Sequence, residues 1–286
     1  MPAITEPKGD GEPITLALDP YVGRLVTVTI GVGDGSYRFL FDTGGGWTTV
    51  TPKVAGDAGC VPFGRLVGFR MSGEKVPTRK CGRHALVLAD TALRDVAVLD
   101  DVGVFDIMAL LPEGVPELGG VFALSTLKDR PFTLDLESRQ LILETPRSLA
   151  RRTEGRPPSR IRIGREAAGY GAAIFVEVAA NPEPLWCLLD SANLDAVIVA
   201  PHTLEQLGMK LDDPRALTGE NTFPIDIVVA GRPVRGAEAR VRDIIHDGAI
   251  SEAVMRRFVI TADLAGERIW FAPRAAEAFA GAKSVH

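Results

Sequence analysis

Two segments of the sequence that lie 148 residues apart share one pattern. Residues 40–45 read LFDTGG and residues 188–193 read LLDSAN, so that the two aspartates coincide. In each segment an apolar run leads into an aspartate and small residues, which is typical of a buried strand that ends in a turn. The same shift aligns VTVTI at 26–30 with IFVEV at 174–178. The chain is therefore predicted to fold as two related halves.

A second correspondence follows later in each half, at a shift of 128 residues. FTLDLESRQLIL at 132–143 matches ITADLAGERIWF at 260–271. Because the two shifts differ by 148 − 128 = 20, the second half lacks 20 residues between its aspartate and this closing hairpin. The additional residues of the first half include 60–81, CVPFGRLVGFRMSGEKVPTRKC, whose glycine-containing middle predicts a further hairpin.

The composition excludes several classes of protein. The chain has 286 residues, of which 46% are hydrophobic, and a net charge of −5 without any basic block. This argues against nucleic acid or an anionic membrane as the main partner. No apolar run is long enough to span a bilayer. Runs rich in Val, Ile, Leu and Thr predict an all-β fold, with short helices at 201–208 and around 249–257.

The polar, proline-containing stretch TPRSLARRTEGRPPSR divides the chain near its middle and reads as a linker. The expected organisation is a flexible lead-in at 1–13, an N-terminal lobe at 14–144, an inter-lobe linker at 145–160, a C-terminal lobe at 161–273 and a tail at 274–286.

The repeated segments resemble those of aspartic proteases of the pepsin and retropepsin class, especially the two-lobed retropepsin-like proteins of bacteria. The resemblance is carried by FLFDTGGGWTTV at 39–50 and LWCLLDSANLDAVIV at 185–199. It is also carried by GVFALSTL at 120–127 and GAISEAVM at 248–255, where that family has two apolar residues and a glycine before a short helix. It covers about residues 14–273 and implies a two-lobed acid protease fold with a pseudo-twofold repeat.

The resemblance implies an aspartic endopeptidase that acts on a peptide or protein without a metal or other cofactor. Asp42 and Asp190 would be the catalytic pair, because one carboxylate must take a proton from water while the other carboxyl donates one to the scissile carbonyl. Thr43 and Ser191 would bond across to the opposite lobe and hold the two turns rigid. Gly44 would let the backbone approach the carboxylates.

Three small residues depart from the pattern of the family. Ala192 stands where the second turn would have glycine, and Ala123 and Ser251 stand where glycine precedes the short helices. A Cβ fits at such a position if φ is negative, but a left-handed backbone would be strained by about 1–2 kcal/mol. These departures leave a second hypothesis open, in which the chain is a catalytically silent protein that binds peptides or has a structural role.

Residues 63–79 are expected to form a single flap over the cleft, as in pepsin-like enzymes, so that a monomer would be complete. No tyrosine occurs in this segment, and Phe69, Arg70 and Met71 are the large residues near its tip. Trp47 follows the first turn, where it would either line a substrate subsite or pack on the core of the lobe.

Cys60 and Cys81 lie at the two ends of the expected hairpin, where antiparallel arms would bring them close enough for a disulfide. Cys187 lies in the apolar run LWCLL and is expected to be a free, buried thiol. A disulfide favours a periplasmic or secreted protein whose signal peptide has been removed. The alternative is a pair of free thiols in a cytoplasmic protein.

Overall fold

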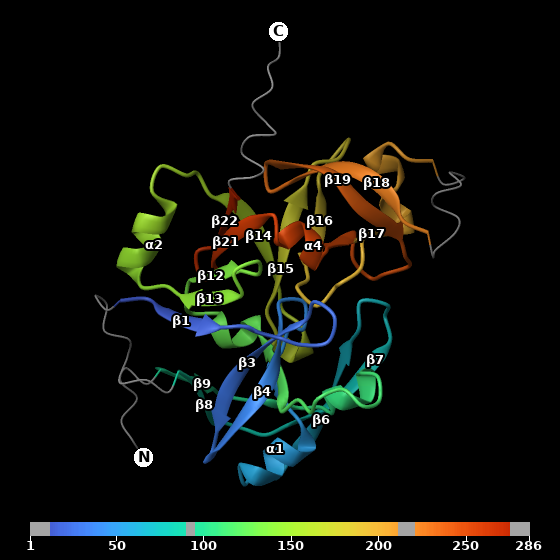
Figure 1. Ribbon diagram of the computed structural model, residues 1–286. Coiled ribbons are helices and arrows are strands. Elements are labelled where there is room, and N and C mark those ends of the chain that lie inside the picture. Colours follow the sequence, from blue (N-terminus) through green and yellow to red (C-terminus); the bar gives the residue numbers. More distant parts are fainter. Residues whose placement is uncertain (1–11, 90–94, 211–220, 275–286) are drawn as a thin grey trace.

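The computed structural model describes residues 12–89, 95–210 and 221–274. Strands are its main regular secondary structure, and its two halves meet along a shared sheet (Figure 1). The all-β class with few short helices is therefore confirmed. Within the described residues, no helix has the length and apolar character that crossing a bilayer requires.

The first half contributes thirteen strands to the described structure. They are β1 (Ile14–Ala17), β2 (Asp19–Pro20), β3 (Val26–Val32), β4 (Gly35–Asp42), β5 (Thr49–Val50), β6 (Phe63–Phe69), β7 (Lys75–Lys80), β8 (His84–Ala89), β9 (Asp95–Leu99), β10 (Gly103–Val104), β11 (Gly120–Ala123), β12 (Phe132–Asp135) and β13 (Gln140–Leu143).

The second half contributes nine strands to the described structure. They are β14 (Ser159–Gly164), β15 (Ala173–Val178), β16 (Leu185–Leu189), β17 (Val197–Val199), β18 (Phe223–Val229), β19 (Arg232–Val241), β20 (Gly248–Ile250), β21 (Phe258–Asp263) and β22 (Arg268–Pro273). The helices are α1 (Pro52–Asp57), α2 (Pro146–Thr153) and α4 (Glu252–Met255), and short 3-10 turns occupy Ile107–Leu110, Leu124–Leu127, Ala167–Gly169, Pro201–Thr203 and Glu205–Leu207.

The strands form two sheets. Ten strands of the first half form one sheet in the order β6-β7-β10-β5-β11-β4-β3-β8-β9, with β2 paired to β3 beside this path. The other sheet has 12 strands in the order β1-β13-β12-β21-β22-β14-β15-β16-β20-β17-β19-β18. Because β1, β12 and β13 come from the first half, this second sheet joins the two halves (Figure 1).

The internal repeat is visible where the two halves meet in this sheet. β12 and β21 pair antiparallel with Thr133 opposite Thr261, and these two residues are 128 positions apart. Their hydroxyl groups are 2.9 Å apart, and both side chains are buried. Two residues that are equivalent in the repeat therefore face each other across the pairing of β12 and β21. This places the pseudo-twofold axis between the two threonines.

The segment 145–160, expected as a linker, contains an ordered helix. Thr145 caps α2 through a reciprocal pair of hydrogen bonds with Ser148, and Pro146 occupies the first helical turn. Such a capping box satisfies backbone donors at the start of a helix. The buried Glu144 carboxylate also accepts a hydrogen bond from Arg152, which fixes the helix against the sheet.

The two other expected helices are shorter than the sequence pattern suggested. Residues 201–208 form two successive 3-10 turns, which end at Gly208 with a left-handed φ of 74°. In the segment 249–257 the chain first completes β20, and only Glu252–Met255 forms the helix α4.

Candidate active site

The two repeated aspartates lie at the ends of corresponding strands. Asp42 is the last residue of β4, which runs parallel to β11, and Asp190 directly follows β16, which runs parallel to β20. The apolar residues before each aspartate are buried, including Phe41 and Leu189. Burial of these strands in separate sheets leaves each aspartate at a turn where the halves meet.

Reciprocal hydrogen bonds join the two turns. The backbone N–H of Thr43 donates to Ser191 Oγ at 3.0 Å, and the N–H of Ser191 donates to Thr43 Oγ1 at 2.9 Å. Each hydroxyl also donates to a carbonyl of the opposite strand, Thr43 to Leu189 at 2.6 Å and Ser191 to Phe41 at 3.4 Å. Both hydroxyl residues are buried, so these bonds hold the turns in one geometry.

The backbone of each turn donates hydrogen bonds to its own aspartate. Gly44 N donates to Asp42 Oδ1 at 2.8 Å, and Ala192 N and Asn193 N donate to Asp190 Oδ1 at 2.9 and 3.0 Å. A Cβ placed on Gly44 would lie only 2.6 Å from Asp190 Cγ. The Asp190 carboxyl therefore lies against the backbone of the first turn, and a glycine is required there.

Burial dominates the electrostatics of the two carboxyl groups. It raises the pKa of Asp42 to about 7, and the charge of Asp190 adds to the effect, whereas the N–H groups of Gly44 and Gly45 oppose it. Burial also raises the pKa of Asp190, against the N–H groups of the second turn. The pair can hold a shared proton near neutral pH, because two adjacent carboxylates cannot easily both ionise.

The small residues that depart from the family pattern do not distort the backbone. Ala192 does not have a positive φ. The φ of Ala123 is −108° and that of Ser251 is −78°. Their Cβ atoms therefore cause no left-handed strain. The N–H of Ala192 bonds to Asp190 as that of Gly44 bonds to Asp42.

The expected flap is a hairpin of β6 and β7. Cys60 and Cys81 form a disulfide at its base, with Cα atoms 5.7 Å apart. Cys187 is a free, buried thiol whose pKa burial raises to about 12. The disulfide ties the two ends of the hairpin together and leaves its tip to be held by other contacts.

The tip of the flap reaches the second half. Met71 O accepts a hydrogen bond from Ile245 N at 3.0 Å, and the Met71 side chain packs against an apolar cluster of the second half that includes Ile244. Phe69 and Arg70 are exposed, and Arg70 pairs with Glu74 at 3.2 Å. Of the expected tip residues, only Met71 therefore contacts the opposite half in this way.

Trp47 packs between the halves instead of facing an open cleft. It is buried, its Nε1 donates to Asp101 O at 3.2 Å, and its ring stacks on Tyr170 with centroids 5.3 Å apart. Lys80 Nζ lies 3.3 Å from both Tyr170 Oη and Asp101 Oδ2. Sequence analysis missed Tyr170 and Lys80, and no sequence motif marks either of them.

A separate cavity of about 560 Å³ lies away from the aspartates, beside α2 and the strands β21 and β22. Four arginines and one tryptophan contribute to its lining: Arg151, Arg152, Arg156, Arg274 and Trp270. Because neither turn contributes to its lining, this cavity is not part of the candidate active site.

Comparisons with known proteins identify the fold. No family model matches the chain, and no curated protein matches it. Basic 7S globulin from soybean is similar in structure, with a TM-score of 0.56, 10% sequence identity and coverage of 94% of this chain and 96% of the globulin. Conglutin gamma, a basic 7S globulin from lupine seeds, has a TM-score of 0.57 and 11% identity, with 94% and 97% covered. The protein edgp has a TM-score of 0.57 and 8% identity, with 96% and 98% covered.

The chain has the two-lobed, pepsin-like fold. The expected fold is thus confirmed over nearly the whole chain, whereas identities of 8–11% carry no information about activity. None of these three names denotes a protease. The comparisons therefore show the fold alone.

Proposed function

We propose that the chain binds an extended peptide between its lobes and hydrolyses it with a water molecule activated by Asp42 and Asp190. The observation that carries this proposal is the intact pair of turns. Both aspartates are present, their turns are joined by reciprocal bonds of 3.0 and 2.9 Å, and burial raises the pKa of both carboxyls.

The proposed reaction requires one proton shared by the two carboxyls. The ionised carboxylate takes a proton from water as the water oxygen attacks the carbonyl carbon, and the protonated carboxyl gives its proton to the carbonyl oxygen. The carboxyl that took the proton from water then gives a proton to the leaving nitrogen, while the other carboxylate takes a proton from a hydroxyl of the tetrahedral intermediate. The C–N bond breaks, and the carboxyl pair again holds one proton. The two aspartates perform every proton transfer in this scheme.

The proposed substrate is a peptide or a protein segment in extended conformation, and the proposed active form is a monomer. One chain supplies both aspartates, and one hairpin reaches across to the second half. A second copy is therefore not needed to complete the site.

A non-catalytic peptide-binding or structural protein is the second candidate. Two observations favour it. The similar structures include globulins from soybean and lupine, and the flap tip is bonded to the opposite half through Met71 and Ile245. A flap held in this way would restrict entry of a substrate.

Cleavage of a mixed peptide library at acidic and neutral pH separates the two candidates. For the endopeptidase we expect pepstatin-sensitive cleavage that is lost in both Asp42→Asn and Asp190→Asn. Asp34→Asn is the control, because Asp34 is exposed in the turn between β3 and β4. Peptide binding without cleavage would support the second candidate and overturn the first.

A further inference from the structure

The two aspartate turns are each held from the opposite half, but by different donors. In the first turn, Gly46 O accepts a hydrogen bond from Ala172 N at 3.0 Å. In the second turn, Leu194 O accepts one from the Arg24 guanidinium at 2.7 Å. These contacts correspond in the repeat, because 194 − 46 and 172 − 24 both equal 148. A charged side chain thus replaces a backbone donor at one of two equivalent positions.

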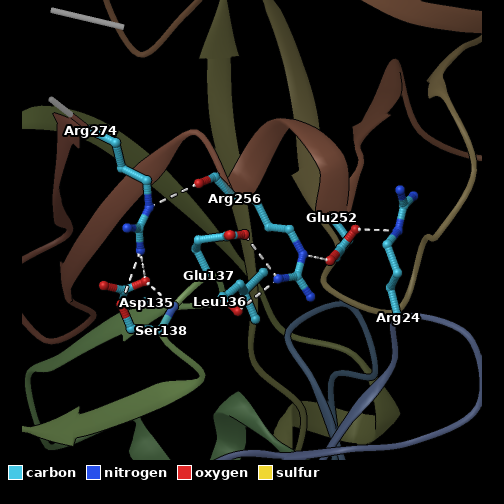
Figure 2. A network of polar contacts seen from close by, with 8 residues as sticks. All are labelled: Arg24, Asp135, Leu136, Glu137, Ser138, Glu252, Arg256 and Arg274. Atoms are coloured by element: carbon cyan, nitrogen blue, oxygen red, sulfur yellow. Dashed lines mark hydrogen bonds and ion pairs between the residues drawn. The ribbon is translucent and has the colours of Figure 1, made fainter. Parts of the chain in front are cut away.

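The Arg24 guanidinium also binds a buried carboxylate. Its Nε lies 3.0 Å from Glu252 Oε2, and the Glu252 side chain is only 1% exposed. The other carboxylate oxygen accepts a hydrogen bond from Arg256. Figure 2 shows the Glu252 carboxylate between the two guanidinium groups. At the corresponding position of the first half, 128 residues earlier, stands the fully buried Leu124.

Glu252 contacts the second turn directly through its backbone. Its N–H donates to Asn193 O at 3.0 Å, and Asn193 N in turn donates to Asp190 Oδ1 at 3.0 Å. Arg24, through Leu194 O, holds the next residue of the same turn. Two successive carbonyl groups after Asp190 are therefore held by the Arg24–Glu252 pair.

We propose that Arg24 and Glu252 are positioning residues that lock the second turn, and with it the Asp190 carboxyl, against the first half. This inference builds on the proposed function, because it assigns these residues to the same site. Arg24 is suited to the role because its planar fork can bind a carboxylate and a carbonyl together. A lysine at this position would present a single ammonium group to both acceptors.

Another arginine in the same network provides a matched control. Arg274 of the second half pairs with Asp135 of the first, and its guanidinium also donates to Ser138 Oγ and Arg256 O (Figure 2). It crosses between the halves as Arg24 does, but Asp135, Ser138 and Arg256 lie outside the turn after Asp190. Its loss should weaken the contact between halves without moving that turn.

The test compares Arg24→Gln, Arg24→Lys and Arg274→Gln in the full chain, with two measurements that need no turnover. The first is ¹³C-carboxyl NMR titration of Asp190, which faces Asp42. In Arg24→Gln we expect the pKa of Asp190 to rise, because the N–H bonds of the turn, which lower this pKa, weaken. The second is amide hydrogen exchange at residues 193–196, which should become about tenfold faster.

Arg24→Lys should lie between the wild type and Arg24→Gln, and Arg274→Gln should match the wild type in both measurements. The inference is overturned if Arg24→Gln titrates and exchanges like the wild type. It is equally overturned if Arg274→Gln produces the same changes, since the effect would then be a general loosening of the halves.

Peptide hydrolysis gives a third, separate measurement. If the wild type cleaves peptides, Arg24→Gln should lower kcat about 10- to 100-fold and leave KM unchanged, as expected for a residue that orients a catalytic group. An equal kcat in both proteins would overturn the inference. If the wild type does not cleave, the proposed function fails, and the NMR and exchange measurements still decide the role of Arg24.

Discussion

The two halves of this protein carry the same turn but surround it differently. Thr43 and Ser191 make matching hydrogen bonds, and each aspartate accepts backbone N–H groups from its own turn. Beside the first turn the repeat has the apolar Leu124, and beside the second it has the ion-paired Glu252. The hydrogen bonds between the two turns therefore follow the internal repeat, whereas the residues packed around the turns differ between the halves.

The largest effect should come from giving the first half the charge of the second. Leu124→Glu would place a carboxylate in a fully buried position where the repeat offers Ala172 in place of Arg24. A buried carboxylate without its cation costs several kcal/mol, so we expect the free energy of unfolding to fall by about 4 kcal/mol. Urea denaturation measures it, with Leu124→Met as the control; a loss below about 1 kcal/mol would contradict the comparison.

The flap distinguishes the halves next most strongly, because only the first half has the 20 additional residues in its sequence. Cys60→Ser removes the disulfide at the base of the hairpin. Opening a loop of this size should lower the free energy of unfolding by about 3 kcal/mol in the chain-entropy model. Thermal unfolding under non-reducing conditions measures the loss. Under reducing conditions neither protein has the disulfide, so Cys60→Ser and the wild type should unfold alike.

Mass spectrometry of the non-reduced protein provides the corresponding chemical evidence. A linked peptide that contains Cys60 and Cys81 is expected, and it would also support the proposed periplasmic or secreted location. Two thiols that alkylate under native, oxidising conditions would argue for the cytoplasmic alternative.

A smaller effect should follow from exchanging the small residues of the two turns. In Gly44→Ala the new Cβ would lie 2.6 Å from Asp190 Cγ, so the carboxyl must move. We expect a loss of about 1–3 kcal/mol in stability, together with loss of any cleavage. The reverse change, Ala192→Gly, removes a Cβ that causes no strain, because Ala192 does not have a positive φ. Its cost is the greater backbone freedom of glycine, which should be less than about 1 kcal/mol. Equal losses in the two variants would show that the turns are not distinguished by this contact.

The effect of pH is the smallest when it is taken per pH unit. The pKa of Asp42 is raised from 3.8 to about 7 in the folded protein, so the folded state binds this proton more tightly than the unfolded state. The free energy of unfolding should therefore decrease as the pH rises from about 4 to 7, by at most about 1.4 kcal/mol per pH unit. Urea denaturation across this range should give a shallower decrease for Asp42→Asn. An unchanged slope in that variant would contradict the raised pKa.

Local patterns predicted the central part of the site. Asp42 and Asp190 could be located from the sequence, because an apolar strand followed by an aspartate and small residues occurs twice at one spacing. The hairpin between Cys60 and Cys81 was predicted from its glycines and from the lack of matching residues in the second half. The helix α2 was missed because its polar composition resembles a linker, although Thr145 and Pro146 are residues that begin helices.

Residues outside the two aspartate motifs could not be assigned in this way. Arg24, Tyr170 and Ile245 occur in connecting segments, and the sequence around them contains no feature that pairs them with the second turn, Trp47 or the flap. Their partners lie 170, 123 and 174 positions away respectively, so only the fold brings them together.

The sequence alone determined that the chain is a duplicated β protein with one aspartate at the end of a buried strand in each half. Strand periodicity and repeat spacing can be read directly from the order of the residues. Only the tertiary structure decided that β1, β12 and β13 join the sheet of the second half, that the flap tip contacts Ile245, and that Arg24 reaches Leu194 and Glu252. These contacts depend on how the two halves pack, because burial and hydrogen bonding between distant segments are set by their arrangement in space and not by their neighbours in sequence.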